Sequence, residues 1–464
     1  MKLTKTLFLF FIVISLFPLC ACKDKSLTEI IENPEKYANA SGFVVYDNQL
    51  IKYCGDSEKV VIPENIVTIY DSAFADCKTL KEIIFHPNII QIGSSAFSGC
   101  SALSEIVIND GVISLGTRAF SGCSSLKKVT LPAYLRNIPY GLFMNCTSLE
   151  KIEIPASVVS IGDCAFNNCR NLTRITIPDR VSEISSYTFA GCTSLKEINL
   201  PTELTSIKDY AFDNNKELTN IEIPSAVTRI GNGAFAYCVK LENPILPAKL
   251  IHLGESAFFG CESITEITLP RNLDSLRKEA FSMCTSLSKV EFSEKLISIE
   301  QRAFYNCRNL KDIALPSTIT KIGASAFEGC GFSVFTAPPL VATIDKNAFK
   351  NCKNLVSIDL PSSLMSIGAY AFSGCEALSY FVFPENITEI SSGLFSECSS
   401  LSQVILPINL EKAGSLVFNN TSRLVFVDYP STQKEWDKIK KEEDFLKDGA
   451  FNKNVRFGGL EKTE

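Results

Sequence analysis

The chain has 464 residues, of which 46% are hydrophobic and 21% are charged, and its formal net charge is −6 with a pI near 5.4. This high apolar content excludes an intrinsically disordered chain. The acidic balance provides no overall positive field, so we expect no nucleic-acid partner.

The first residues resemble a bacterial lipoprotein signal peptide. Lys2 and Lys5 precede an apolar segment at 7–19, too short for a membrane span, which runs into LCAC at 19–22. The resemblance implies that residues 1–21 are removed and that Cys22 is acylated, which anchors the protein to a membrane without spanning it. Cys20 is a second candidate, and an ordinary secretory signal is the alternative.

Two further segments precede the repeats. Residues 22–40 are polar and are expected to form a linker with a short helix near 26–37. Residues 41–72 predict an N-terminal cap and a first coil. The cap is a hairpin whose strands, 43–46 and 50–53, are joined by a turn at Asp47 and Asn48.

From residue 73 to residue 430 the chain repeats itself. Sixteen Phe residues from Phe74 to Phe418 are spaced by 23, with one step of 22 before Phe349. In the unit at 166–185, outward Arg174 and Thr176 alternate with inward Ile residues, which predicts a short strand ended by Pro178. A helical turn is expected around the Ala-Phe pair. Frequent glycines precede it, and we expect them to adopt positive φ: Gly93, Gly162, Gly231 and Gly323.

A unit of 23 residues cannot bury its apolar side alone, but a stack of units can. The motifs LxxIxLP, IG and AFxxC, over roughly 41–430, resemble the BspA-like branch of the leucine-rich repeat family. The resemblance implies a β-rich right-handed solenoid of 23-residue coils, with short parallel strands and short helical turns.

Fourteen cysteines from Cys77 to Cys398 occupy one column of the repeat. Three interpretations compete: a disulfide ladder, a metal site, or small buried side chains that bond to nearby backbone. A metal site would need closely spaced ligands such as C-x2-C, and the sequence has none in this column. Cysteines one coil apart would point in the same direction, which fits disulfide geometry poorly. We therefore favour the third interpretation, which Asn215 and Thr421 in the same column also suit. Occasional disulfides remain the alternative.

Residues 431–464 are expected to cap the C-terminal end. The segment 431–446 predicts an amphipathic helix with Trp436, Ile439 and Phe445 facing inward, and 454–457 predicts a last strand. The sequence offers no cluster of candidate catalytic or metal-binding residues, because its only two His residues, His86 and His252, occupy unrelated columns of the repeat. We therefore predict no enzyme activity, no metal and no cofactor.

The outward strand positions give two candidate protein-binding sets. The first, which we call the basic set, lies in the early repeats on a mixed polar face with a basic bias: Lys127, Lys128, Lys151, Arg174 and Lys196. Three acidic residues are interspersed among them: Glu150, Glu153 and Glu197. The second is an apolar set in the last repeats: Val356, Tyr380, Val382, Ile405 and Phe426. Exposed apolar patches often mark interaction sites, but the C-terminal cap could equally fold over this second set.

The family resemblance implies a function. BspA-like proteins are associated with adhesion, so we expect a lipoprotein on the bacterial outer membrane or cell surface, facing outward. It would bind host matrix proteins such as fibronectin or fibrinogen, or other bacteria, through the sheet face of its repeats. The alternative is a periplasm-facing scaffold of the envelope with no host ligand.

Overall fold

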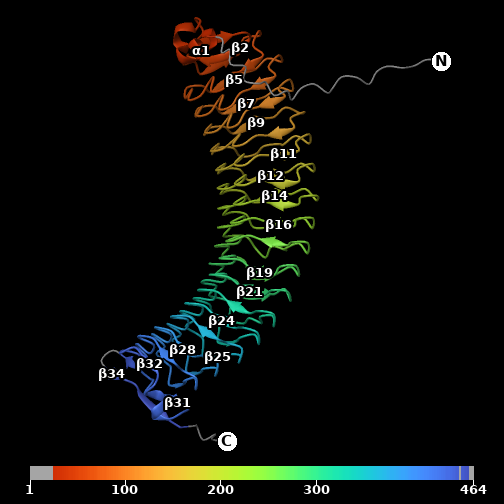
Figure 1. Cartoon of the computed structure of the whole chain (residues 1–464). Coiled ribbons are helices and arrows are strands. Elements are labelled where there is room, and N and C mark those ends of the chain that lie inside the picture. Colours follow the sequence, from red (N-terminus) through yellow and green to blue (C-terminus); the bar gives the residue numbers. More distant parts are fainter. Residues whose placement is uncertain (1–24, 449–450, 459–464) are drawn as a thin grey trace, which may run out of the picture.

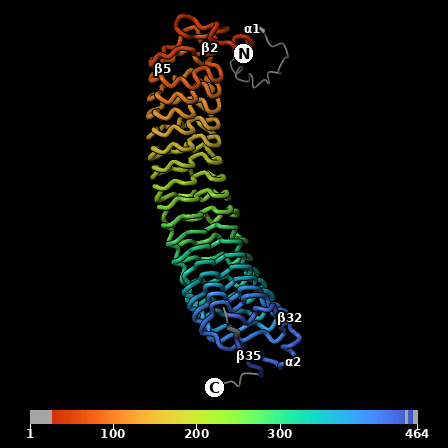
Figure 2. The backbone as a smooth tube through the Cα atoms, turned by 90° about the vertical axis from the view of Figure 1, so that its left-hand side faces the viewer, coloured from red at the N-terminus to blue at the C-terminus, as the bar shows by residue number. Residues whose placement is uncertain are grey.

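The computed structural model describes residues 25–448 and 451–458, which form a long curved rod (Figure 1). Successive coils lie one on the next along the whole rod, as the turned view shows (Figure 2). Over these described residues, no helix has the length and apolar character needed to cross a membrane. The repeat therefore builds one continuous stack, as the sequence predicts.

Most coils contribute a long strand, which corresponds to the predicted LxxIxLP segment. The long strands and those that extend their stack are β3 (Lys59–Val61), β5 (Glu82–Ile84), β7 (Glu105–Val107), β9 (Lys128–Thr130), β12 (Arg174–Thr176), β14 (Glu197–Asn199), β18 (Glu266–Thr268), β20 (Lys289–Glu291), β23 (Val334–Thr336), β25 (Ser357–Asp359), β27 (Tyr380–Val382), β29 (Gln403–Ile405), β31 (Phe426–Tyr429) and β35 (Asn454–Phe457). Pairing is parallel and in register with the repeat, so that Arg174 lies opposite Glu197 and Ile175 opposite Ile198. We call the outward side of these strands the long-strand face.

A second, two-residue strand follows in nearly every coil. These short strands are β4 (Thr68–Ile69), β6 (Gln91–Ile92), β8 (Ser114–Leu115), β10 (Asn137–Ile138), β11 (Ser160–Ile161), β13 (Glu183–Ile184), β15 (Ser206–Ile207), β16 (Arg229–Ile230), β17 (His252–Leu253), β19 (Ser275–Leu276), β21 (Ser298–Ile299), β22 (Lys321–Ile322), β24 (Thr343–Ile344), β26 (Ser366–Ile367), β28 (Glu389–Ile390), β30 (Lys412–Ala413) and β32 (Lys440–Lys441). They also pair in parallel, one coil to the next.

The core is a file of stacked phenylalanine rings. All sixteen repeat Phe residues, from Phe74 to Phe418, are fully buried. Each ring centroid lies 4.9 to 6.0 Å from the next along the file. The predicted superposition of equivalent side chains is thereby confirmed, and the Phe file packs in one apolar core with the inward Leu, Ile and Val residues of the same coils.

The cysteine column bonds to backbone. From Cys100 to Cys398, thirteen thiols each donate to the carbonyl oxygen of the core Phe in the preceding coil, at 3.1 or 3.2 Å. All sixteen cysteines in the described residues are free thiols. Thr421 bonds within its own coil, to the Phe418 oxygen at 2.6 Å. Asn215 does not fit the role we predicted, because its buried amide has no hydrogen-bond partner in the described chain.

The turn that follows the short strand differs from the prediction in two respects. Around Phe97, the N–H of Cys100 bonds to the Phe97 oxygen, but Gly99 at φ 75° stops the segment from continuing as a helix. Consecutive tight turns therefore replace the expected helical turn. Positive φ occurs at Ser95 rather than at Gly93, where a Cβ atom would lie 2.7 Å from the backbone nitrogen of Asp71. The glycine is needed for close approach of neighbouring coils and not for its backbone angles.

The N-terminal end contains the predicted hairpin. Helix α1 (Lys25–Glu32) and the 3-10 helix η1 (Pro34–Tyr37) precede strands β1 (Phe43–Tyr46) and β2 (Gln49–Tyr53), which pair antiparallel. Asp47 and Asn48 have φ of 45° and 58°, as a tight two-residue hairpin turn requires. Strand β2 then pairs in parallel with β4, so the hairpin joins the end of the short-strand stack.

The C-terminal end corrects the predicted helix. Only one turn, α2 (Gln433–Trp436), is helical, and the chain then forms strand β32, which pairs with β30. The edge of β30 would otherwise leave backbone groups unpaired, and the N–H groups of Lys440 and Glu442 satisfy the oxygens of Glu411 and Ala413. Three buried side chains match the prediction: Trp436, Ile439 and Phe445. Strand β33 (Lys447–Asp448) pairs antiparallel with β34 (Phe451–Asn452), and the predicted last strand is β35, paired with β31.

Candidate protein-binding surface

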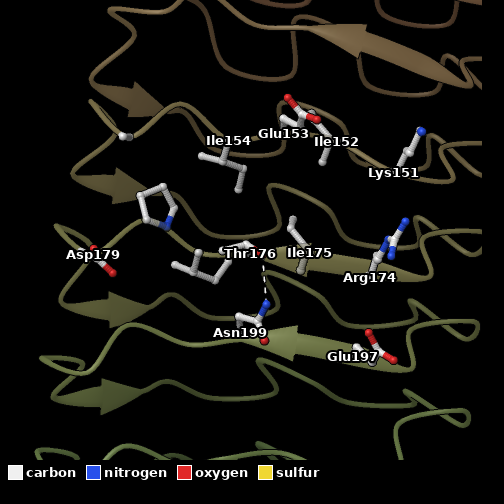
Figure 3. Close-up of a pocket in the computed structure, with 13 residues that line it drawn as sticks. Lys151, Ile152, Glu153, Ile154, Arg174, Ile175, Thr176, Asp179, Glu197 and Asn199 are labelled. Carbon is white, nitrogen blue, oxygen red and sulfur yellow. Dashed lines mark hydrogen bonds between the residues drawn. The ribbon is translucent and has the colours of Figure 1, made fainter.

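The long-strand face presents its side chains in vertical files. Figure 3 shows Lys151, Arg174 and Glu197 one below another at the start of three successive strand positions. Glu153, Thr176 and Asn199 form a second file, in which the Asn199 amide donates to the Thr176 hydroxyl at 3.2 Å. The 23-residue register therefore converts residues distant in sequence into neighbours on one surface.

The basic set lies together on this face, as the alignment predicts. Lys127, Lys128, Lys151, Arg174 and Lys196 are all exposed. Lys128 is neutralised by an ion pair with Glu105 at 2.6 Å. Within the described chain the other four form no ion pair, although Arg174 lies opposite Glu197. Lys151 and Arg174 are therefore unpaired cations in the described chain, although the exposed carboxylates of Glu150, Glu153 and Glu197 lie near them.

A hollow adjoins the basic set (Figure 3). It measures about 630 Å³ and is lined by Lys151, Ile154, Arg174, Ile177 and Asn199 among others. Strand pairing is weak here, because residues 151–154 contribute only one bridge, from Lys151 to Arg174. Two residues of the basic set, Lys151 and Arg174, therefore line a depression together with Ile side chains and three carboxylates, a feature that periodicity alone does not predict. The carboxylates are those of Glu153, Asp179 and Glu197.

Sequence reasoning missed a second region, centred on Pro244 and Ile245. Pro244 replaces the inward aliphatic residue of the long strand, and Ile245 is 83% exposed. Proline has no N–H to donate, and in the described chain no strand forms at 243–246. Instead, the Asn243 side-chain oxygen accepts from the N–H groups of Thr265 and Glu266 at 2.9 and 3.0 Å. The signal for this region was the proline in a central strand position.

Two hollows of about 920 and about 700 Å³ flank Pro244 and Ile245, which line both. Five acidic and three basic residues line them: Glu197, Glu222, Glu242, Glu266, Glu291, Lys196, Arg271 and Lys289. Among these carboxylates only Glu291 forms an ion pair within the part of the chain that the structure describes, with Lys289 at 2.7 Å, and this pairing lowers the pKa of the Glu291 carboxyl.

The apolar set lies on the same face near the C-terminal end. Val356, Tyr380, Val382 and Phe426 are 39% to 46% exposed, and Ile405 is half-buried. Within residues 25–448 and 451–458, the C-terminal coil extends the edge of the sheet and does not fold over these side chains. Strand β35 pairs with β31, so that Asn454 lies opposite Phe426. The Arg456 guanidinium lies 5.2 Å from the Phe426 ring centroid and bonds to Asp428 at 2.6 Å.

The remaining candidates form no site. His252 is half-buried, and its pKa is lowered by burial and by the nearby Arg229 and Arg277. In the described part of the chain, no group of three His, Cys, Asp or Glu residues could hold a metal ion. The expected lipidation site, Cys22, lies outside the described residues.

Comparisons with known proteins agree with this geometry. The family model described as BspA type leucine rich repeat region matches in overlapping segments at 46–173, 136–258, 228–355 and 320–440. The chain is 28% identical to a leucine-rich repeat protein from Bacteroides ovatus, with a TM-score of 0.55 and coverage of 88% of this chain and 96% of that chain. It is 23% identical to a leucine rich cell surface protein from Faecalibacterium prausnitzii, with a TM-score of 0.38 and coverage of 88% and 95%.

A third solved structure, the pneumococcal vaccine antigen PcpA, is 21% identical, with a TM-score of 0.37 and coverage of 70% of this chain and 82% of that chain. No curated protein matches the chain. The family match spans most of the sequence and coincides with the coils of the rod. This chain therefore belongs to the BspA-type leucine-rich repeat family.

Proposed function

We propose that this protein is a lipid-anchored, non-enzymatic surface protein of a bacterium, which binds protein ligands through its long-strand face. A stiff rod with one continuous patterned face suits this role, because many side chains can contact a partner with little ordering cost. The LCAC sequence at 19–22 supports lipid anchoring at Cys22. Host matrix proteins such as fibronectin or fibrinogen, or the surfaces of other bacteria, are the ligands that the family resemblance favours.

One observation carries the proposal. Lys151 and Arg174, which form no ion pair in the described chain, and the exposed Tyr380 project from equivalent positions of their coils. The exposed Val382 lies two residues after Tyr380 on the same strand. Protein interfaces combine a desolvated apolar and aromatic centre with a charged surround that steers association. Both elements are present on the long-strand face.

A binding experiment tests the proposal. We expect the purified protein to bind immobilised fibronectin or fibrinogen, or intact partner bacteria, and the double variant Lys151→Glu/Arg174→Glu to bind at least tenfold more weakly. Tyr380→Ser/Val382→Ser should weaken binding similarly. The matched control is Lys216→Glu/Arg308→Glu, since both residues are exposed and unpaired in the described chain but lie on the turns.

Localisation needs its own measurement. Externally added protease should remove the protein from intact cells if it faces outward. Protection in intact cells, with digestion only after the outer membrane is disrupted, would instead support the periplasm-facing scaffold. Loss of membrane association in a Cys22→Ala variant would test the lipid anchor.

A further inference from the structure

A small pocket lies on the turn side of the rod, away from the long-strand face. Its walls come from the residue that directly follows the core Phe in three successive coils: Phe259, Ser282 and Tyr305. Ser282 is the small member of this file, so it leaves a space between two aromatic side chains that are two coils apart. At about 4.8 Å per coil this separation is roughly 10 Å, which accommodates one ring in contact with both.

Further residues complete the aromatic lining of the pocket. The Tyr237 ring packs edge-on against Phe259 with ring centroids 5.1 Å apart, and Tyr237 is 49% exposed. Gly260 allows this approach, because a Cβ atom there would lie 3.2 Å from the Tyr237 ring. The pocket has a volume of about 290 Å³, near the lower limit of about 300 Å³ for sites that hold drug-sized ligands. It therefore suits a single ring.

The polar groups of the pocket are of both signs. Glu279 pairs with Arg302 at 3.5 Å and accepts from the Ser256 hydroxyl at 3.1 Å. The Arg302 guanidinium lies 5.5 Å from the Tyr305 ring centroid. Glu262 adds an exposed carboxylate that forms no ion pair in the described chain.

Ser282, which lines the pocket, is only 1% exposed, and its hydroxyl has no hydrogen-bond partner within the described chain. Buried hydroxyls are normally bonded, so an unpartnered one in a pocket wall points to a missing polar partner.

We infer that this pocket binds a neutral sugar ring. Carboxylates oppose an anion and Arg302 opposes a cation, whereas a neutral ligand with hydroxyls can accept from the guanidinium and donate to the carboxylates. The C–H face of a sugar packs on aromatic rings, and an inward hydroxyl would partner Ser282. This site is independent of the protein-binding face proposed above, and either could exist without the other.

Saturation-transfer NMR with the full protein and a panel of methyl glycosides of glucose, galactose, mannose and N-acetylglucosamine tests the inference. We expect at least one glycoside to bind, with an affinity unchanged between low and high salt because the ligand is neutral. Phe259→Ala and Tyr305→Ala should each weaken binding about tenfold or more. The matched control is Tyr140→Ala, because Tyr140 also lies beneath an arginine, Arg118, at 5.0 Å, but does not line this pocket.

Dextran and mannan, tested beside their methyl glycosides, distinguish a polysaccharide chain from a free sugar as the source of the ring. Tighter binding of the polysaccharide, lost with Tyr305→Ala, would assign a glycan chain. The inference is overturned if no glycoside or polysaccharide binds the folded protein, or if Tyr305→Ala, shown by circular dichroism to be folded, binds unchanged. Displacement of the sugar by tetramethylammonium or inorganic phosphate would also overturn it, since the pocket would then select charge.

Discussion

The thiol of Cys169 donates to the carbonyl oxygen of Phe143, 26 residues earlier, at 3.2 Å. The same bond recurs in coil after coil, so the cysteine column ties each coil to the Phe carbonyl of its predecessor. Burial raises the pKa of the Cys146 thiol to about 12, which keeps this donor protonated at neutral pH. In this fold the cysteine is a small buried donor.

Asn215 interrupts this column, and Asn215→Cys should stabilise the protein. Among the described residues, neither polar atom of the buried Asn215 amide has a hydrogen-bond partner, at a cost of about 1–3 kcal/mol for each buried unsatisfied group. A thiol at this position can reach the Phe189 oxygen as its neighbours do. We expect the free energy of unfolding to rise by about 1–2 kcal/mol, measured by urea denaturation. The reciprocal change, Cys169→Asn, should lower it, and a stabilising effect of that change would contradict the interpretation.

The repeated elements could be predicted from the sequence because each position is reinforced by many copies. The strand alternation of Arg174, Ile175 and Thr176 and the buried Phe file follow from period and polarity alone. Features that occur once were not predictable in this way. Pro244 occupies the inward strand position in one coil, and the three-coil file of Phe259, Ser282 and Tyr305 forms a pocket only after neighbouring coils are superposed.

Two mispredictions share a physical cause. The helix expected at 431–446 has good amphipathic spacing, but the unpaired edge of β30 recruits Lys440 and Lys441 into a strand. Gly93 suggests a positive φ by residue type, but its actual constraint is the backbone of the preceding coil. In both cases a contact with the adjacent coil decides the structure, and local sequence does not contain that contact.

Gly254→Ala tests this close-approach role. A Cβ atom at Gly254 would lie within 2.5 Å of the backbone nitrogen of Asn232, which cannot move aside as a side chain can. We expect a loss of about 1–3 kcal/mol in the free energy of unfolding. The control is Gly122→Asn, where φ is 74° but a Cβ atom would meet nothing closer than 3.5 Å, and where Asn fills the same column at Asn145 and Asn168. The control should cost less than about 1 kcal/mol, and equal losses would refute the distinction.

Asp213 should make stability depend on pH. Burial raises the pKa of its carboxyl from 3.8 to about 6, so the folded state holds the proton more tightly than the unfolded state. Proton binding at Asp213 therefore adds to the free energy of unfolding. This contribution is complete below pH 3.8 and is lost as the pH rises through about 6. Asp213→Asn should therefore stabilise the protein at pH 7.5 by about 1 kcal/mol after allowance for solvent screening, and by little at pH 4.

Asn suits this position, since Asn167 in the same column donates to the Ala190 oxygen at 3.2 Å. Urea denaturation of both proteins from pH 4 to pH 7.5 measures the difference. A stability difference that does not vary over this range would show that Asp213 is not the titrating group.

Thiol labelling distinguishes the buried column from accessible cysteines. Cys54 is exposed, Cys77 and Cys164 are half-buried, and the other thirteen cysteines of the described chain are buried. Because the thiolate is the reactive form, burial slows alkylation both by excluding the reagent and by raising the thiol pKa, as at Cys192, where it reaches about 12. In folded protein at pH 7.5, peptide mapping by mass spectrometry should find Cys54 alkylated first, Cys77 and Cys164 more slowly, and the buried column last. After unfolding in urea without reductant, every one of these sixteen thiols should react. Column cysteines that react only once reductant is added would mean that the chain forms disulfides between coils, and the interpretation of the thiol as a hydrogen-bond donor would then fail.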